Sequence, residues 1–175
     1  MTDVNSQWTW FAPIIIIFII FAFAFVAIHR ATSKDGWYQH IKHPLLALPS
    51  WAQILLWFIM YALIAYVWYN LNSTITDNNT FDWLNWVFTL HMCFSLAWWF
   101  FFWGDAQTIV GLVLLIMMVA SAAWLMVYVI SDVLNTVFLS VYLVWLIYML
   151  YFNISVLAQN KINTAPFNWS NLLPW

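Results

Sequence analysis

The stretch TIVGLVLLIMMVASAAWLMVYV, residues 108–129, contains no charged side chain and decides how the rest of the chain is interpreted. Periodicity cannot distinguish a helix from a strand in so uniformly apolar a run, but length can. A membrane-spanning helix needs roughly 20 mostly apolar residues, whereas a strand of a membrane barrel needs about ten with alternating polarity. We therefore predict that this stretch is a transmembrane helix.

Four further stretches meet the same requirement. They are residues 10–28, 50–69, 84–103 and 134–157, and the run at 14–20 again shows no alternation. Hydrophobic residues make up 66% of the chain and charged residues only 6%, a composition that a soluble domain cannot bury. The sequence predicts an all-α integral membrane protein, a bundle of five transmembrane helices that forms a single membrane domain over residues 1–175.

The basic residues indicate an orientation. Arg30, Lys34 and Lys42 lie between the first and second spans, and Lys161 follows the fifth. With five spans these regions share a side, which the positive-inside rule makes cytoplasmic. We expect the N-terminus outside and the C-terminus in the cytoplasm. The first span lacks a basic residue ahead of it, so we interpret it as a retained helix rather than a signal peptide.

Several function classes find no support in the sequence. The chain contains no glutamate, its three glycines are scattered, and its single cysteine, Cys93, lies inside a span. No pair of buried histidines has a spacing suited to a metal or a bis-histidine haem. We therefore expect neither catalytic residues nor a metal site. The net charge is -2 and the few basic residues form no patch that would bind nucleic acid.

Aromatic and polar side chains recur at helical spacing in three of the spans. Lipid favours neither hydroxyl, amide nor imidazole groups, so such stripes normally turn toward protein or a cavity. Two interpretations remain open: a ligand pocket, or polar residues that bond across helices within a packed core. The stripes are Trp57, Tyr61, Ile64 and Trp68; His91, Ser95, Trp98 and Phe102; and Tyr142, Trp145, Met149 and Asn153.

Six tryptophan positions, one of them already in a stripe, fall near the expected ends of spans, where aromatic belts form. We expect these to anchor the protein at the membrane surface: Trp8, Trp10, Trp68, Trp83, Trp86 and Trp103.

The linear motifs are more specific. Residues 37–44 read WYQHIKHP, residues 48–51 read LPSW, and Trp57 is followed by MYAL at 60–63. Later come HMCFSLAW at 91–98, FWG at 102–104 and a block from VYLVW to FN over 141–153. In order and spacing, residues 37–160 resemble the translocator protein family (TspO/MBR), also called tryptophan-rich sensory proteins or peripheral benzodiazepine receptors.

This resemblance implies a five-helix bundle, often a homodimer, whose first loop closes a pocket for porphyrins such as protoporphyrin IX and haem. It implies no required cofactor and, together with the missing presequence, favours a bacterial inner membrane. The pocket residues would be Trp37, Trp51, Trp57, Tyr61, His91, Ser95, Trp98, Tyr142, Trp145, Met149 and Asn153. Loop contacts to the ligand carboxylates would be Arg30, Lys34, His40, Lys42 and His43. Trp37 and Trp51 would form the lid, because Pro44 and Pro49 hold the loop extended.

The chain departs from the family pattern at several positions. The family lysine before the loop proline is His43, the first proline of its PP pair is Leu48, and its third-helix asparagine is Ser95. A serine hydroxyl offers fewer hydrogen bonds than an asparagine amide, so ligand preference is expected to differ. Phe100 and Val141 replace two further prolines.

A second function remains open. The chain would then be a structural or assembly subunit of a larger membrane complex, with its aromatic faces packed against partner helices. The small residues Ala120, Ser121, Ala122 and Ala123 would let another helix approach closely, in a homodimer or a heteromer. Some family members are linked to light- or oxygen-dependent porphyrin breakdown, but without an acid, base or metal in place we do not expect enzymatic turnover here.

Overall fold

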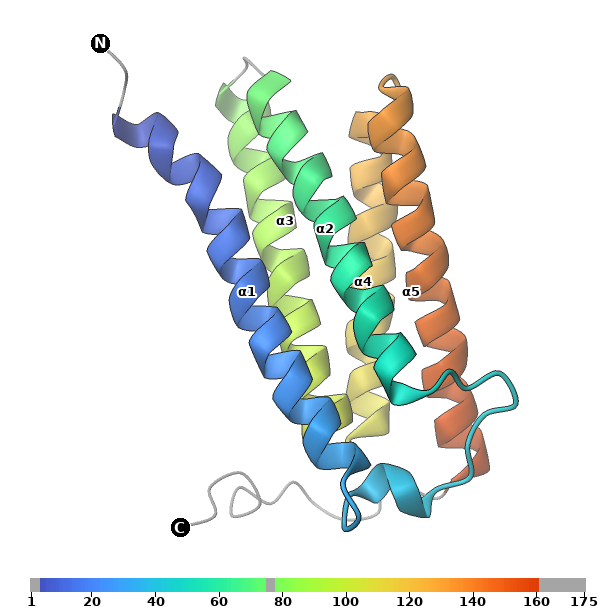
Figure 1. Cartoon of the computed structure of the whole chain (residues 1–175). Coiled ribbons are helices and arrows are strands. Elements are labelled where there is room, and N and C mark those ends of the chain that lie inside the picture. Colours follow the sequence, from blue (N-terminus) through green and yellow to red (C-terminus); the bar gives the residue numbers. More distant parts are fainter. Residues whose placement is uncertain (1–3, 75–77, 161–175) are drawn as a thin grey trace.

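The computed structural model describes residues 4–74 and 78–160, and within them it contains five long helices (Figure 1). These are α1 (Val4–Thr32), α2 (Ser50–Thr74), α3 (Asn78–Trp98), α4 (Thr108–Val129) and α5 (Val133–Gln159). α1, α2, α4 and α5 each contain a stretch long and apolar enough to cross a membrane, and α3 does so together with the residues that follow it as far as Gly104. All backbone polar groups of a helix bond within the segment, so lipid tolerates these elements. The predicted fold class is confirmed.

α4 has the bounds predicted for its span, whereas α1, α2 and α5 are longer than predicted. α1 and α2 extend to Thr32 and Thr74, and α3 begins at Asn78. α3 continues directly into η2 (Trp99–Gly104), a π-helical turn that the apolar pattern did not reveal. The short 3₁₀-helix η1 (Trp37–His40) lies in the first loop.

Local signals set the helix boundaries. Asp132 caps α5, because its carboxylate accepts hydrogen bonds from the backbone N–H groups of Leu134 and Asn135. Pro49 immediately precedes α2, and its carbonyl accepts from Ala52 and Gln53. Between η2 and α4 the chain turns through Ala106, a non-glycine residue with a positive φ of 56°.

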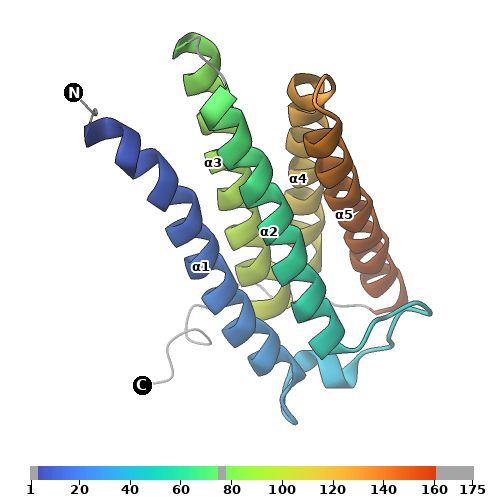
Figure 2. The same cartoon turned by 45° about the horizontal axis from the view of Figure 1, so that its top comes forward.

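The helices α2 to α5 form the bundle, and α1 packs on one side of it. α4 packs most extensively against α5 and α3, while α1 contacts η2, α2 and α3. The first half of α1 leans away from the other helices, and its second half rejoins them near η2 (Figures 1 and 2). The loop that joins α1 to α2 runs beneath the bundle as far as the end of α5 (Figure 1). α1 therefore joins the bundle toward the end where the first loop lies.

Candidate ligand-binding site

The aromatic and polar stripes of α2, α3 and α5 meet inside the bundle. Nine of the predicted pocket residues are at most 7% exposed. They are Trp57, Tyr61, His91, Ser95, Trp98, Tyr142, Trp145, Met149 and Asn153. We call this set the aromatic interior. Its members come from three helices, so the sequence spacing placed each of them on an inward face.

Trp57 lies at the centre of the ring contacts. Its ring centroid is 5.2 Å from that of Tyr61, 5.3 Å from Trp98 and 5.7 Å from Trp145. These separations are those of favourable stacked and edge-on aromatic pairs. The rings therefore contact one another directly, and a guest molecule enters only where ring–ring contacts are exchanged for ring–guest contacts.

The same rings carry polar atoms that lack a partner. Within the described residues, the indole N–H groups of Trp57, Trp98 and Trp145 make no hydrogen bond, and neither do the two amide atoms of Asn153. A buried donor without a partner costs roughly 1–3 kcal/mol, and few are found in native proteins. Four of the predicted pocket residues thus present unmet hydrogen-bonding capacity to the interior.

One buried hydrogen-bond chain links α2 to α3 and η2. Trp99 donates its indole N–H to the Tyr61 hydroxyl at 2.7 Å, and that hydroxyl also bonds the Ser95 hydroxyl. Sequence reasoning identified Tyr61 and Ser95 but missed Trp99. Trp98 and Trp99 are consecutive in the sequence, and helical spacing does not indicate that both face inward.

A second chain joins α4, α3 and α5. The Ser121 hydroxyl donates to the Met117 and Met118 carbonyls at 2.9 and 3.0 Å, and its oxygen lies 2.7 Å from Nδ1 of His91. Because the serine proton is directed at these carbonyls, we assign the His91 proton to Nδ1, which then donates to the Ser121 oxygen. Nε2 of His91 then accepts from the Tyr142 hydroxyl, also at 2.7 Å. Both ring nitrogens are satisfied in a neutral imidazole, which is the packing role that the sequence left open for this residue.

The π-helical turn explains the depth of the aromatic packing at the loop end. Trp98, Trp99, Phe102 and Trp103 have no exposed surface, and Trp98 stacks on Phe102 with centroids 5.3 Å apart. Two of the tryptophans assigned to surface belts, Trp68 and Trp103, are buried, so that prediction was wrong for them. π-turns are rare and are frequently found at functional sites.

The first loop is fastened over this end. Trp37, partly buried, donates its indole N–H to the Trp103 carbonyl at 3.1 Å. Tyr38 packs between His43 and Trp103, with ring centroids 4.6 and 5.0 Å away. Burial raises the pKa of the Tyr38 phenol to about 12.

Tyr148 of α5 and Asn160, which caps that helix, hold the next part of the loop. Asn160, at the end of α5, accepts from the Lys42 N–H at 2.8 Å and donates to the Lys42 carbonyl at 2.9 Å. The Tyr148 hydroxyl donates to the Leu46 carbonyl at 2.9 Å. On the α2 side, Gln53 donates to the Leu48 carbonyl at 2.9 Å. The loop is thus anchored to three elements of the bundle.

The remaining predicted residues lie elsewhere. Trp51 is 68% exposed and lies outside the hydrophobic core, so the structure does not place it over the aromatic interior as the lid hypothesis required. Its position on the first turn of α2 turns it outward. The loop residues Arg30, Lys34, His40, Lys42 and His43 are all exposed, and none reaches the aromatic interior.

Other polar and aromatic groups lie at the opposite end of the bundle. Trp83 and Trp86 are 66% and 71% exposed and, with Asn79 and Asp82, line an open cavity of about 430 Å³. The side chains of Trp8 and Trp10 fall outside the residues whose side chains the structure describes. In the described part of the chain, no three histidine, cysteine or aspartate side chains group as a metal site would require.

The fold and the interior together define a multi-pass integral membrane protein whose buried centre is aromatic and rich in unmet polar groups. The model of the TspO/MBR family matches residues 13–159. The chain belongs to the TspO/MBR family, and this membership supports a ligand-binding or transport-type role in the membrane. A search among curated proteins found no match.

Proposed function

We propose that the protein is a membrane receptor or carrier that binds a planar, porphyrin-like ligand in the aromatic interior. The observation that carries the proposal is the set of unpartnered polar atoms on Trp57, Trp98, Trp145 and Asn153. A ligand that offers flat ring faces and a few hydrogen-bonding atoms complements this set, because small-molecule sites combine apolar walls with a few converging polar groups.

The packed state of the interior sets a condition on binding. The rings around Trp57 now contact each other at 5.2–5.7 Å between centroids. A macrocycle would replace these contacts by stacking on the same faces, so little apolar contact is lost when the rings separate. The hydrogen bonds gained by the indole and amide groups would favour the bound state.

The loop end is the expected entrance. Trp37 and Tyr38 cover the buried rings of η2, and the cations Arg30, Lys34 and Lys42 are exposed in the neighbouring sequence. Ligand propionates would reach these cations at the membrane surface, where charge-assisted hydrogen bonds are formed without burying a charge. The macrocycle itself would lie deeper, between α2, α3 and α5.

Titration of protoporphyrin IX into the full-length protein in detergent, followed by quenching of tryptophan fluorescence, tests the proposal. We expect saturable binding, weakened by Asn153→Leu, which keeps the branched shape of the side chain but replaces both amide atoms with methyl groups. Trp86→Phe is the matched control, because Trp86 is exposed at the opposite end. The absence of saturation, or equal affinities for all three proteins, would refute the proposal.

We also propose that the protein is a homodimer in a bacterial inner membrane, with its C-terminus cytoplasmic. Ala120 and Ala123 are exposed on the outer face of α4, whereas Ala122 is buried against the bundle, so a second copy can approach α4 closely. Labelling of cysteines introduced into the first loop, in intact and in opened cells, would test the orientation. Cross-linking through cysteines at positions 120 and 123 would test the dimer.

A further inference from the structure

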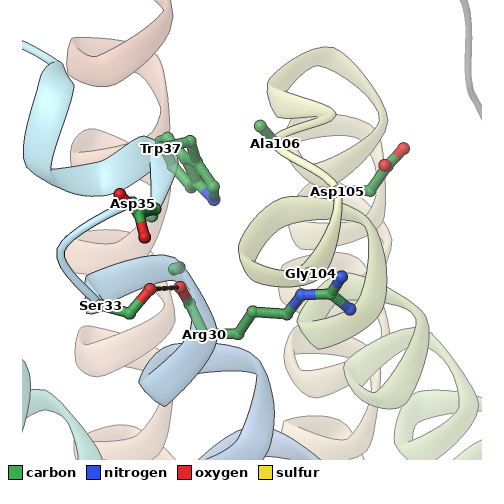
Figure 3. Close-up of a pocket in the computed structure, with 9 residues that line it drawn as sticks. Arg30, Ser33, Asp35, Trp37, Gly104, Asp105 and Ala106 are labelled. Atoms are coloured by element: carbon green, nitrogen blue, oxygen red, sulfur yellow. Dashed lines mark hydrogen bonds between the residues drawn. The ribbon is translucent and has the colours of Figure 1, made fainter. Parts of the chain in front are cut away.

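A separate cavity lies between the end of α1, the first loop and the turn after η2. Its volume is about 350 Å³, within the range of small-ligand sites. Arg30, Ser33, Asp35 and Trp37 line one side, and Gly104 and Ala106 line the other (Figure 3). The cavity lies outside the aromatic interior, and none of the nine residues of that set contributes to it.

The position of this cavity in the membrane follows from the spans that end beside it. The apolar stretch of α1 ends at Thr32, that of α3 and η2 ends at Gly104, and α4 begins at Thr108. A cavity bounded by all three ends lies where the hydrocarbon gives way to the polar headgroups. Lipid headgroups are therefore the molecules present there at the highest concentration.

The lining offers both signs of charge and one aromatic face. The Arg30 side chain extends from α1 toward Gly104, and the Asp35 carboxylate faces the same space from above it (Figure 3). The Ser33 hydroxyl donates to the Arg30 carbonyl at 2.8 Å and fastens the turn between these two residues. Trp37 is held in place by its bond to the Trp103 carbonyl.

We propose that this cavity binds a zwitterionic phosphoethanolamine group, as an aminophospholipid headgroup carries it. The guanidinium of Arg30 pairs with the phosphate, for which its planar fork of donors is suited. The primary ammonium lies between the Asp35 carboxylate and the face of Trp37, where a hydrogen-bonded ion pair and a cation–π contact are both available. The proposal does not rest on porphyrin binding.

The same chemistry predicts which headgroups are rejected. A choline group has no N–H to donate to the carboxylate, so it loses the hydrogen bonds that an ethanolamine group makes. A glycerol headgroup carries no cation, and its net negative charge meets the Asp35 and Asp105 carboxylates of the lining. The expected order of affinity is ethanolamine, then choline, then glycerol phospholipid.

Native mass spectrometry of the full-length protein, with an equimolar mixture of the three phospholipids bearing identical acyl chains, tests this order. We expect retention of the ethanolamine lipid to exceed that of the choline lipid by about threefold, because the N–H hydrogen bonds that distinguish the two headgroups belong to an exposed ion pair, whose contribution is small. Asp35→Asn should equalise these two lipids. Arg30→Gln should lower the retention of all three, and Lys34→Gln, an exposed neighbour outside the cavity lining, should change nothing.

Equal retention of the three lipids by the unaltered protein would overturn the proposal, as would an ethanolamine preference that persists in Asp35→Asn and Arg30→Gln. Asp35 and Arg30 are exposed, so neither substitution removes a buried side chain. Competition with soluble glycerophosphoethanolamine separates two sources of the same group. Displacement of the lipid would show that the free compound also binds, and persistence would restrict the site to lipid. Both results support the headgroup chemistry.

Discussion

The indole of Trp99 donates to the hydroxyl of Tyr61 at 2.7 Å, and through that hydroxyl η2 is tied to α2 in the middle of the bundle. Tyr61 also bonds Ser95, so one oxygen joins three segments. The side chains of Tyr61, Ser95 and Trp99 are each at most 1% exposed. The pairing therefore determines how the π-helical turn is oriented toward the aromatic interior.

Removing the hydroxyl that joins these segments tests its contribution to stability. Tyr61→Phe leaves the Trp99 N–H and the Ser95 hydroxyl without their shared partner, and should lower the free energy of unfolding by about 1–2 kcal/mol. Tyr66→Phe on the same helix is the control, because Tyr66 is 39% exposed and its ring contact with Phe138 survives. Thermal unfolding in detergent measures both; equal midpoints would contradict the assignment.

The bonded state of His91 predicts how an iron porphyrin binds. Ser121 and Tyr142 occupy both imidazole nitrogens at 2.7 Å. A haem in the aromatic interior would therefore be bound by its ring faces and not by an iron–histidine bond, which would require the Tyr142 bond to break. The Soret absorption of bound haem should be the same in His91→Gln and in the unaltered protein. A shift confined to the variant would show that His91 ligates the iron.

Three glycines offer a graded test of packing. A Cβ on Gly36 would overlap the Ala31 carbonyl oxygen, which is backbone and cannot move aside, whereas one on Gly104 would lie 3.8 Å from its nearest neighbour. Gly36→Ala should loosen the first loop and cost about 1–3 kcal/mol, and Gly104→Ala should be nearly neutral. A Cβ on Gly111 would lie 3.0 Å from the Asn153 amide nitrogen and from Phe102 Cβ.

Gly111→Ala is therefore expected to displace Asn153 and to weaken porphyrin binding more than it lowers stability. Titration and thermal unfolding of the three variants, measured side by side, separate these effects. Unfolding midpoints that did not follow the order Gly36, Gly111, Gly104 in decreasing severity would contradict the packing described here.

The hydrogen bonds between Asn160 and Lys42 are expected to slow the opening of the first loop. Asn160→Ala removes both bonds, at 2.8 and 2.9 Å, and should raise the amide exchange of residues 41–48. If the loop covers the entrance, porphyrin association and dissociation should both become faster with little change in affinity. Gln159→Ala, an exposed neighbour that makes no bond to the loop among the described residues, is the control. Unchanged exchange in Asn160→Ala would show that the bonds do not hold the loop.

The sequence predicted the fold because length and uniform apolarity alone specify a membrane helix. It also predicted the inward residues of α2, α3 and α5, since helical spacing places Trp57 and Tyr61, or Trp145 and Asn153, on one face. The sequence did not predict burial correctly at positions where a tryptophan can lie either at the membrane surface or in the protein interior. Trp51 and Trp103 both lie near span ends, and only tertiary packing makes one exposed and the other buried.

Features that depend on contacts distant in sequence were not predictable from the sequence either. Asn160 bonds Lys42 across 118 positions, and Ser121 reaches His91 from another helix. In the sequence Ser121 is one of several small residues in its span, and nothing in the local pattern distinguishes a hydroxyl that bonds a histidine from one that eases helix packing. The π-helical turn at Trp99–Gly104 likewise leaves no apolar periodicity of its own.

The buried phenol of Tyr38 predicts how the loop responds to alkaline pH. Its pKa is raised from 10.0 to about 12 by burial, so the folded loop binds this proton more tightly than the unfolded loop does. The stabilisation is complete below pH 10 and is lost as the pH rises toward 12. Exchange of the loop amides, corrected for the intrinsic effect of hydroxide, should therefore accelerate between these values. Tyr38→Phe keeps the ring contacts with Trp103 and His43 but has no proton to lose, so its corrected exchange should stay level. The same acceleration in Tyr38→Phe would assign the transition to another group.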